Sequence, residues 1–206
     1  FPAGWSMDKP HYLNSDQELL VLSGEIEISG VAYREGDYAY LPPGYARYRL
    51  RSTHGATVLT YYEGEHLAFY TAAPPGMYQP KKLIRRVQSS KLRWKSARDG
   101  SQRKLLRRDR ATGEETWLVK VGAAAAASSP SRGTATLNTS VEEFFLLEGE
   151  LSTPQGVMQP GAYAWRAPNT AIGPAVSRAG YQAILRSKGG APGGRPAAET
   201  VEFSLD

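Results

Sequence analysis

The chain has 206 residues, of which 41% are apolar and 22% charged, and its formal net charge is +5. This balance predicts one or two globular domains that fold unaided, and it excludes the low hydrophobicity and high net charge of disordered chains. No apolar run approaches the roughly 18 residues of a membrane-spanning helix, and Phe1–Trp5 lacks the regions of a signal peptide. The absence of cysteine excludes disulfides and thiolate chemistry and agrees with a reducing compartment. We therefore expect a cytoplasmic protein with no membrane partner.

The strongest signal along the chain is an internal repeat. Residues 17–46 align without a gap with residues 142–171, at an offset of 125, and nine of the thirty aligned positions are identical. Because self-similarity of this kind marks a duplicated structural unit, the chain is predicted to contain two copies of one unit.

Each copy is predicted to form short strands separated by turns. In the first copy the apolar run Leu19–Leu22 ends at a glycine, and alternation resumes over Glu25–Ile28. A strand rich in tyrosine then follows Gly36 and stops at the turn residues 42–44. Many short strands at this spacing are typical of an all-β sandwich or barrel.

The segment between the two copies is strongly basic. Residues 81–110 contain thirteen Lys or Arg and two Asp, a local charge of +11 that leaves −6 for the rest of the chain. Such a tract could contact nucleic-acid phosphates, but we favour a solvated linker over 81–102 and expect no nucleic-acid partner. Residues 81–97 are the best helical candidate. The predicted domains are then 1–80 and 103–206.

The two copies are predicted to differ at their start. Strands expected near residues 104–108 and 115–121 of the second copy would correspond to positions before residue 1 in the first. The first barrel is therefore expected either to lack its opening strands or to be completed by residues 67–78 and the basic linker, which would pair across units or subunits.

The glycine and proline spacing resembles a known superfamily. Gly36, Pro42 and Gly44 match the cupin motif G(X)5PXGXXH(X)3N, and QELLVLSG matches the end of the motif HXH(X)3-4E(X)6G. The chain resembles two-barrel cupins, in particular the acetylacetone-cleaving type and the cupin domains of anti-sigma factors. This resemblance implies an all-β fold of two tandem cupin barrels, each a jelly roll or double-stranded β-helix. It also implies a homodimer, by analogy.

The resemblance further implies a divalent metal held by histidines and one glutamate, but the motif positions carry other residues. These positions are His11, Leu13, Gln17 and Arg47 in the first copy, and Thr136, Asn138, Glu142 and Ile172 in the second. Only His11 and Glu142 are of a metal-binding type, and they lie in different copies, whereas a catalytic metal needs about three protein ligands. We expect both barrels to be metal-free and to hold no cofactor.

Arg47 and His11 are the candidate catalytic residues. Arg47 occupies a position that the family directs into its pocket, where a guanidinium could bind a carboxylate, an enolate or a phosphate. The alternatives are an ion pair with Glu18 or Asp16, or exposure at the barrel mouth. His11 could act as an acid or base because the ordinary pKa of histidine lies near neutrality, or it could be polar surface.

Five further residues are candidates for substrate binding. Gln17 could bond a ligand carbonyl or be a structural amide, and a buried Glu142 could act as a base. Tyr38 and Tyr40 share a strand face by period-two alternation, and Tyr48 flanks the next turn. Tyrosines of this kind either line a pocket or fill the core.

These residues predict a metal-independent enzyme that isomerises, cyclises, dehydrates or cleaves a small carbonyl-bearing or anionic substrate. The alternative is a non-catalytic ligand-binding or structural two-barrel protein. A metal-dependent dioxygenase ranks third, because it needs ligands that the motif positions do not supply.

Overall fold

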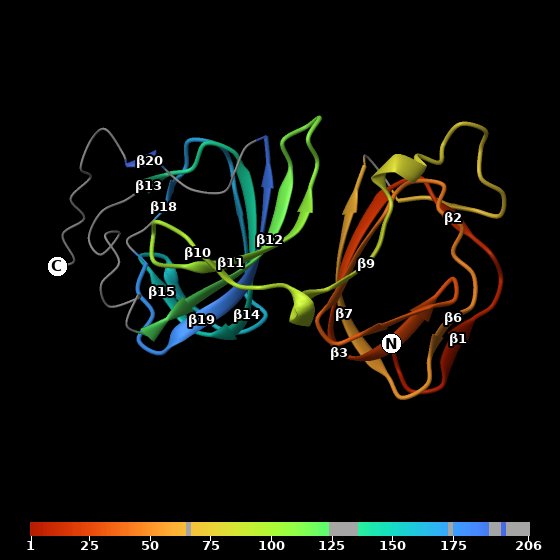
Figure 1. Ribbon diagram of the computed structural model, residues 1–206, viewed down its shortest axis with the longest axis horizontal. Helices are drawn as coiled ribbons and strands as arrows, with labels where there is room; N and C mark the ends of the chain where they lie inside the picture. Colours follow the sequence, from red (N-terminus) through yellow and green to blue (C-terminus); the bar gives the residue numbers. More distant parts are fainter. Residues whose placement is uncertain (65–66, 124–135, 173–174, 190–194, 197–206) are drawn as a thin grey trace. The chain divides into compact units, whose positions relative to one another are not determined.

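The structure is a computed structural model that describes residues 1–64, 67–123, 136–172, 175–189 and 195–196. The chain divides into two compact units, Phe1–Leu92 and Arg93–Asp206, and strands make up most of the regular structure of both (Figure 1). Within the described ranges, no helix is long and apolar enough to cross a membrane.

The N-terminal unit contains nine strands and two 3-10 turns in its described residues. The strands are β1 (Trp5–Met7), β2 (Tyr12–Leu13), β3 (Asp16–Ile28), β4 (Val31–Arg34), β5 (Asp37–Leu41), β6 (Leu50–Ser52), β7 (Ala56–Glu63), β8 (Phe69–Tyr70) and β9 (Ile84–Gln88), and the 3-10 turns are Pro80–Lys82 and Ser89–Lys91. Seven strands form one sheet in the order β1-β6-β3-β5-β9, with β4 and β7 also paired to β3, while β2 pairs with β8.

Strand β3 is central to this unit because its two halves pair with different strands. Its first half pairs with β5 and β7, and its second half pairs with β4 and β6. Between Val21 and Ser23 the register with β7 shifts, and Gly24 follows with a φ of +74°. A bulge followed by a left-handed glycine bends a strand sharply, which lets β3 turn the corner of a barrel.

The basic segment does not form the helix expected over 81–97. Residues Ile84–Gln88 form β9, which is paired antiparallel to β5, and the Tyr33 hydroxyl donates a hydrogen bond to the Arg85 carbonyl at 2.7 Å. Isoleucine and valine favour this extended backbone. The stretch expected as a linker over 81–102 thus contributes β9 to the N-terminal unit and a short strand to the C-terminal unit.

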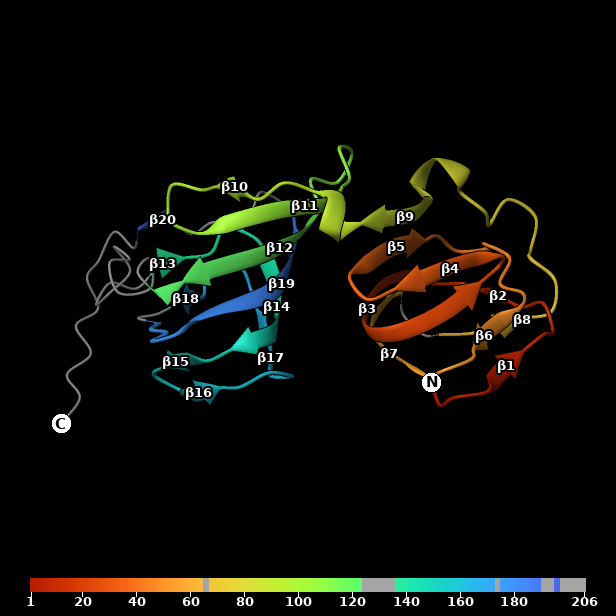
Figure 2. The same cartoon turned by 60° about the horizontal axis from the view of Figure 1, so that its bottom comes forward.

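The C-terminal unit contains eleven strands in its described residues. They are β10 (Lys95–Ser96), β11 (Gln102–Arg108), β12 (Glu115–Gly122), β13 (Thr136–Leu137), β14 (Val141–Gly149), β15 (Leu151–Thr153), β16 (Gly156–Met158), β17 (Tyr163–Arg166), β18 (Ala171–Ile172), β19 (Gly180–Lys188) and β20 (Arg195–Pro196). Six form a sheet in the order β10-β11-β12-β19-β14-β17, in which Figure 2 shows β11, β12 and β19 side by side. The others form the sheet β18-β13-β20 and the pair β15-β16.

The predicted repeat is visible in the strand pairing. Strands β3, β5 and β7 of the first unit correspond to β14, β17 and β19 of the second, and both central strands shift register at equivalent points, Val21/Ser23 and Leu146/Glu148. The turn after β5 or β17 places Gly44 or Asn169 in the left-handed region, with φ of 72° and 61°. Glycine and asparagine are the residues that tolerate this conformation, which explains why these turns stop the strands.

The two units differ at one sheet edge, as the repeat predicts. In the C-terminal unit, β19 pairs on its second edge with β12, which pairs in turn with β11. Among the described residues, β7 pairs with β3 alone. Segments from 67–78 and from the basic stretch do pair, through β8 and β9, but they do so within the N-terminal unit.

Each unit has its own hydrophobic core. In the first unit it includes Leu19, Val21, Ala39 and Leu41, all at most 1% exposed. In the second unit Phe144, Leu146, Leu151 and Ala183 form the centre. Alternate residues of the central strands face these cores, which defines the interior face of each barrel.

Candidate functional site

Gln17 and Arg47 lie on the interior face of the N-terminal barrel. Gln17 is two residues before the core residue Leu19 on β3, so alternation directs both side chains inward. Arg47, in the loop before β6, is only 2% exposed, and its Nε donates a hydrogen bond to Gln17 Oε1 at 2.9 Å. The two motif positions that the sequence placed in a pocket are therefore in direct contact.

The Arg47 guanidinium is a buried cation with spare hydrogen-bonding capacity. Its Nη1 donates to the Tyr45 carbonyl at 2.8 Å, and its carbon lies 5.8 Å from the centre of the Tyr45 ring. Nη2 is buried and has no hydrogen-bond partner in the described part of the chain. Burial lowers the pKa of Arg47 to about 10, so the group remains charged at neutral pH.

Neither alternative raised for Arg47 is seen. The side chain is not at an exposed barrel mouth, and it forms no ion pair with Glu18, Asp16 or any other carboxylate among the described residues. A buried guanidinium normally acquires a carboxylate, because the cost of desolvating the charge is otherwise not offset. Arg47 therefore faces the barrel interior as an uncompensated positive charge.

The main chain brings His11 next to Arg47. The two residues form an isolated antiparallel bridge, in which each backbone N–H donates to the other carbonyl at 2.9 Å. Side chains of residues directly opposite in such a pair project from the same face. The imidazole is half-buried beside the Phe69 ring, with centroids 5.8 Å apart, and its Nδ1 lies 3.5 Å from the Lys9 carbonyl.

The pKa of His11 is lowered from its ordinary value. Burial is the largest cause, and the positive charge of Arg47 adds to it, while the Lys9 carbonyl acts in the opposite direction. The imidazole is therefore neutral at pH 7, the form that can accept a proton.

Tyr62 is a member of the cluster that sequence reasoning missed. It lies opposite Gln17 in the β3–β7 register, and Gln17 Nε2 donates to its hydroxyl at 3.3 Å. Tyr62 is 48% exposed. Partial burial still raises its pKa, and the nearby Arg47 charge opposes that shift. No motif marks this residue, because only the register between β3 and β7 brings it to Gln17.

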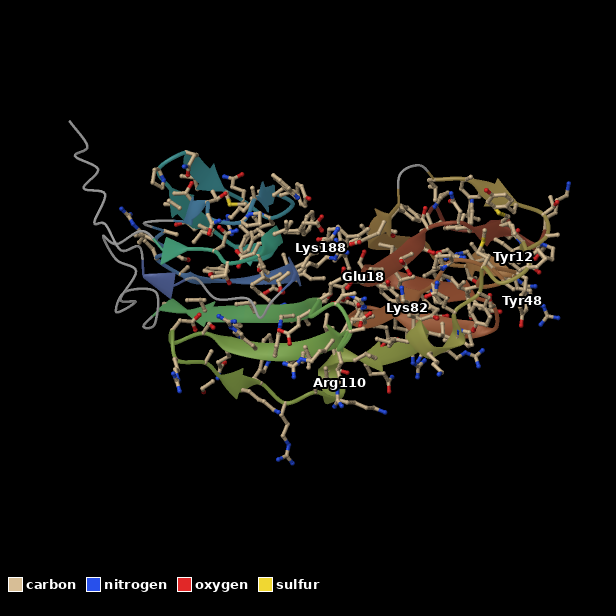
Figure 3. The ribbon with its side chains drawn as sticks, turned by 90° about the horizontal axis from the view of Figure 1, so that it is seen from above. Tyr12, Glu18, Tyr48, Lys82, Arg110 and Lys188 are labelled. Carbon is tan, nitrogen blue, oxygen red and sulfur yellow. The ribbon has the colours of Figure 1, made fainter. Side chains whose placement is uncertain are left out.

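The three predicted tyrosines lie elsewhere. Tyr38 and Tyr40 do share a face, but they pair with Leu20 and Glu18, on the side of β3 opposite to Gln17. The Tyr38 hydroxyl donates to the Glu18 carboxylate. Tyr48 is 41% exposed, and Figure 3 shows it far from Glu18 within the unit. Tyr38 and Tyr40 therefore face away from Gln17, which alternation alone could not say, and a role of the three tyrosines in substrate binding stays a prediction.

Glu142 lies in the other barrel, on the interior face of the C-terminal unit. It is buried opposite Arg166 on the neighbouring strand, and Glu142 Oε2 is 3.8 Å from Arg166 Nη1. Glu142 is thus close to a positive charge. It is not part of the Arg47 cluster.

The residues at the metal-binding motif positions do not fit a metal. In the first barrel Leu13 is buried and has no donor atom, and Arg47 places a cation where a ligand would stand. In the second barrel, the Asn138 amide nitrogen donates to the Ser140 and Ala167 carbonyls at 2.7 Å, and its oxygen accepts from the Thr170 N–H at 2.7 Å. The described residues include no group of three His, Cys, Asp or Glu side chains suited to a metal ion.

Two tandem all-β barrels with this strand order and these motif glycines define the chain as a two-barrel cupin, as the sequence predicted. A family model described as the ChrR cupin-like domain matches residues 84–189, just over half of the chain. The chain belongs to this cupin family.

Solved structures share the fold at low sequence identity. A candidate dioxygenase from Nostoc punctiforme is 16% identical, with a TM-score of 0.77 over 100% of this chain and 72% of that chain. Oxalate decarboxylase from Bacillus subtilis is 11% identical, with a TM-score of 0.58 over 96% of this chain and 68% of that chain. Protein YlbA from E. coli is 16% identical, with a TM-score of 0.55 over 90% of this chain and 70% of that chain. A comparison with curated protein sequences finds no match.

Proposed function

We propose that the N-terminal barrel binds a small molecule with an anionic or carbonyl oxygen on Arg47, and that the chain is a metal-independent enzyme acting on it. The observation that carries this proposal is Arg47 Nη2, a buried donor with no partner in the described part of the chain. Buried donors are almost always satisfied, so an acceptor on a ligand or an ordered water is needed there.

The charge balance of the cluster selects an anion. Gln17 replaces the acidic residue of the family motif, so the hydrogen bond that orients Arg47 leaves its positive charge uncompensated. A carboxylate or enolate would supply both the missing acceptor and the missing negative charge through a charge-assisted hydrogen bond. The Tyr62 hydroxyl, bonded to Gln17, is a second polar group beside such a ligand.

The chemistry proposed is removal of a proton from a carbon next to a carbonyl group. Neutral His11 accepts the proton, and Arg47 stabilises the negative charge that develops on the carbonyl oxygen. Isomerisation, cyclisation and dehydration of carbonyl compounds can all begin with this step. C–C cleavage of a β-hydroxy carbonyl compound begins instead with removal of the hydroxyl proton, and it produces the same kind of enolate, which Arg47 would stabilise. A dioxygenase reaction, suggested by the name of the Nostoc protein, is not proposed because the motif positions lack metal ligands.

A non-catalytic binding protein is the second candidate. Arg47 and Gln17 already orient one another through the 2.9 Å hydrogen bond, and a binding site needs no more than this pair. The two candidates differ in whether His11 has a chemical role.

Pyruvate is a suitable probe because it carries a carboxylate and an ionisable C–H next to a carbonyl. Calorimetry should show that Arg47→Met weakens pyruvate binding at least tenfold, as expected for loss of a charge-assisted hydrogen bond worth about 1.5–3 kcal/mol. Arg51→Met removes a half-exposed guanidinium from β6 of the same unit and should leave binding unchanged. Equal binding by Arg47→Met and the wild type would contradict the proposal.

Deuterium exchange separates the two candidates. In D2O an enzyme should incorporate deuterium into the pyruvate methyl group faster than buffer does, and His11→Asn should lose this exchange while still binding pyruvate. Binding that depends on Arg47 without such exchange would support the non-catalytic candidate.

A further inference from the structure

Three exposed aromatic side chains gather around Arg47 and the residues that contact it. They are Tyr62, Phe69 and Tyr78, and each touches a direct neighbour of Arg47. Phe69 is 65% exposed and Tyr78 is 40% exposed. A single exposed apolar residue needs no explanation, but several aromatic rings at one place are typical of a binding surface, because each keeps apolar area in water.

Phe69 is placed beside the cation by strand pairing. Strand β8 lies antiparallel to β2, with Phe69 opposite Leu13, so these two side chains project from the same face (Figure 2). His11 shares that face with Leu13 by alternation, and it is itself opposite Arg47 in the isolated bridge. The Phe69 and His11 rings are 5.8 Å apart between centroids. The register therefore brings the Phe69 ring, the imidazole and the guanidinium to one face.

Tyr78 reaches the same cation from another segment. Its ring centroid is 6.4 Å from that of Tyr45, and the Arg47 guanidinium carbon lies 5.8 Å from the centre of the Tyr45 ring. A Cβ on Gly44 would lie only 2.9 Å from the backbone nitrogen of Tyr78. The backbone at Tyr78 thus packs closely on the turn before Arg47, which fixes where this exposed ring stands.

Tyr62 links the buried pair Arg47 and Gln17 to solvent. Its hydroxyl accepts the hydrogen bond from Gln17 Nε2, yet nearly half of the side chain is exposed. Gln17 in turn accepts from Arg47 Nε. A single side chain therefore spans the distance from the surface to the buried pair, so a ligand of modest size is long enough to touch both the guanidinium and the exposed rings.

We propose that the Arg47 site is specific for a carboxylic acid that bears an aromatic ring, with the oxyanion on Arg47 Nη2 and the ring of the ligand against Phe69. This inference rests on the function proposed above and names its substrate class. The carboxylate satisfies the buried donor through a charge-assisted hydrogen bond. The aryl group covers the exposed face of Phe69, and aromatic pairs of this kind add to the free energy gained from burying apolar area.

The two features together exclude simpler occupants. A small aliphatic anion such as pyruvate satisfies Arg47 but leaves the three rings in water. A wholly apolar occupant covers the rings but leaves Nη2 without an acceptor, and buried donors are almost always satisfied. An aryl-substituted keto acid meets both requirements.

Phenylglyoxylate and pyruvate are the matched probes for this specificity. Phenylglyoxylate is pyruvate with its methyl group replaced by phenyl, and it has no ionisable C–H next to the carbonyl, so it binds without turnover. Calorimetry on the full chain gives the ratio of the two affinities in each variant. Phe69→Ala removes the proposed ring contact, Phe69→Tyr keeps a ring, and Trp165→Ala is the control, since Trp165 is 57% exposed in the C-terminal unit.

We expect the wild type to bind phenylglyoxylate about tenfold or more tightly than pyruvate, as burial of a phenyl group predicts. Phe69→Ala should reduce this ratio about threefold or more, whereas Phe69→Tyr and Trp165→Ala should keep it. Because the ratio compares two ligands on one variant, a loss of folded protein does not change it.

Arg47→Met separates this inference from the proposed function. If pyruvate binding depends on Arg47 but the wild-type ratio is near one, or the ratio is unchanged in Phe69→Ala, the aromatic specificity is overturned and the proposed function stands. If neither ligand binds the wild type, or both bind Arg47→Met as well as the wild type, the proposed function and this inference fall together.

Discussion

At the scale of single residues, the main contact of the candidate site is between Arg47 and Gln17. The hydrogen bond from Arg47 Nε to Gln17 Oε1 orients a guanidinium that the barrel buries almost completely. In the family motif these two positions would hold a metal, so the same geometry here presents a protein cation instead. Because a protein cation stands where the family would hold a metal, the expected ligand is one that carries an oxyanion and not one that coordinates a metal.

The pKa of His11 tests whether the Arg47 charge reaches the imidazole. NMR titration should give His11 a pKa below 6.5 in the wild type, and a higher one in Arg47→Met, because a nearby positive charge is removed. The rise of the His11 pKa in Arg47→Met should restore only part of the difference from its ordinary value, since burial is the larger cause of the lowered pKa. Arg51→Met is the control, and His11→Asn assigns the signal. An unchanged His11 pKa in Arg47→Met would show that the two groups are not electrostatically coupled.

The lowered pKa of His11 also predicts how the free energy of unfolding depends on pH. Because the folded pKa is below that of the unfolded chain, the unfolded state binds a proton more readily as pH falls through about 6.5. The contribution of His11 to folding stability should therefore decrease as pH falls through this range. The His11→Asn variant should accordingly show a flatter pH dependence in urea unfolding. A steeper dependence in His11→Asn would contradict the sign of the shift.

At the scale of elements, the corner of each barrel depends on one glycine in the central strand. Gly24 and Gly149 are equivalent in the repeat, and their φ angles are +74° and +79°. A Cβ at either position would lie 2.1 or 2.2 Å from the carbonyl oxygen of Gly55 or Gly180. Both the backbone conformation and the close approach of the next strand therefore require glycine.

Gly24→Ala should destabilise the N-terminal unit by about 2 kcal/mol or more, since a strained left-handed residue costs about 1–3 kcal/mol before the overlap is added. Gly30→Ala is the matched control, because Gly30 has a similar φ of +77° but nothing lies within 4 Å of its Cβ position. Urea unfolding measures both. If Gly24→Ala costs no more than Gly30→Ala, the contact with Gly55 does not constrain the corner.

Strand β9 shows how tertiary contacts override local patterns. Leu83, Ile84 and Val87 recur among lysines and arginines and suggest a helix, yet the structure has an extended strand there. The open edge of β5 accepts its backbone hydrogen bonds, and Tyr33 adds one to Arg85. A periodicity of only three apolar residues cannot compete with a sheet edge that needs pairing.

At the scale of the whole molecule, the two copies share a fold and differ in their interiors. The first barrel has a guanidinium from the loop before β6, and the second has one from strand β17. The homodimer and the cytoplasmic location stay predictions from the sequence.

The charge distribution of the whole chain predicts no specific binding to nucleic acid. Several basic residues of 81–110 are already paired, Arg103 with Asp99, Arg108 with Glu115, and Arg107 with both Asp109 and Glu114. Ion pairs of this kind reduce the number of phosphates that a tract can neutralise. Fluorescence anisotropy with a labelled duplex should show no binding at physiological salt. Tight binding with a steep salt dependence would contradict this prediction.

The sequence by itself determined the repeat, the strand and turn pattern and the cupin class, because glycine, proline and alternating apolar residues act locally and leave a readable spacing. It also selected Arg47, His11 and Gln17 as candidates through motif positions. Only the tertiary structure decided which face of β3 is interior, which places Tyr38 and Tyr40 on the face opposite to Gln17 and brings Tyr62 to Gln17. It alone showed that Arg47 is buried without a counter-charge, since register and burial arise from contacts between strands far apart in the chain.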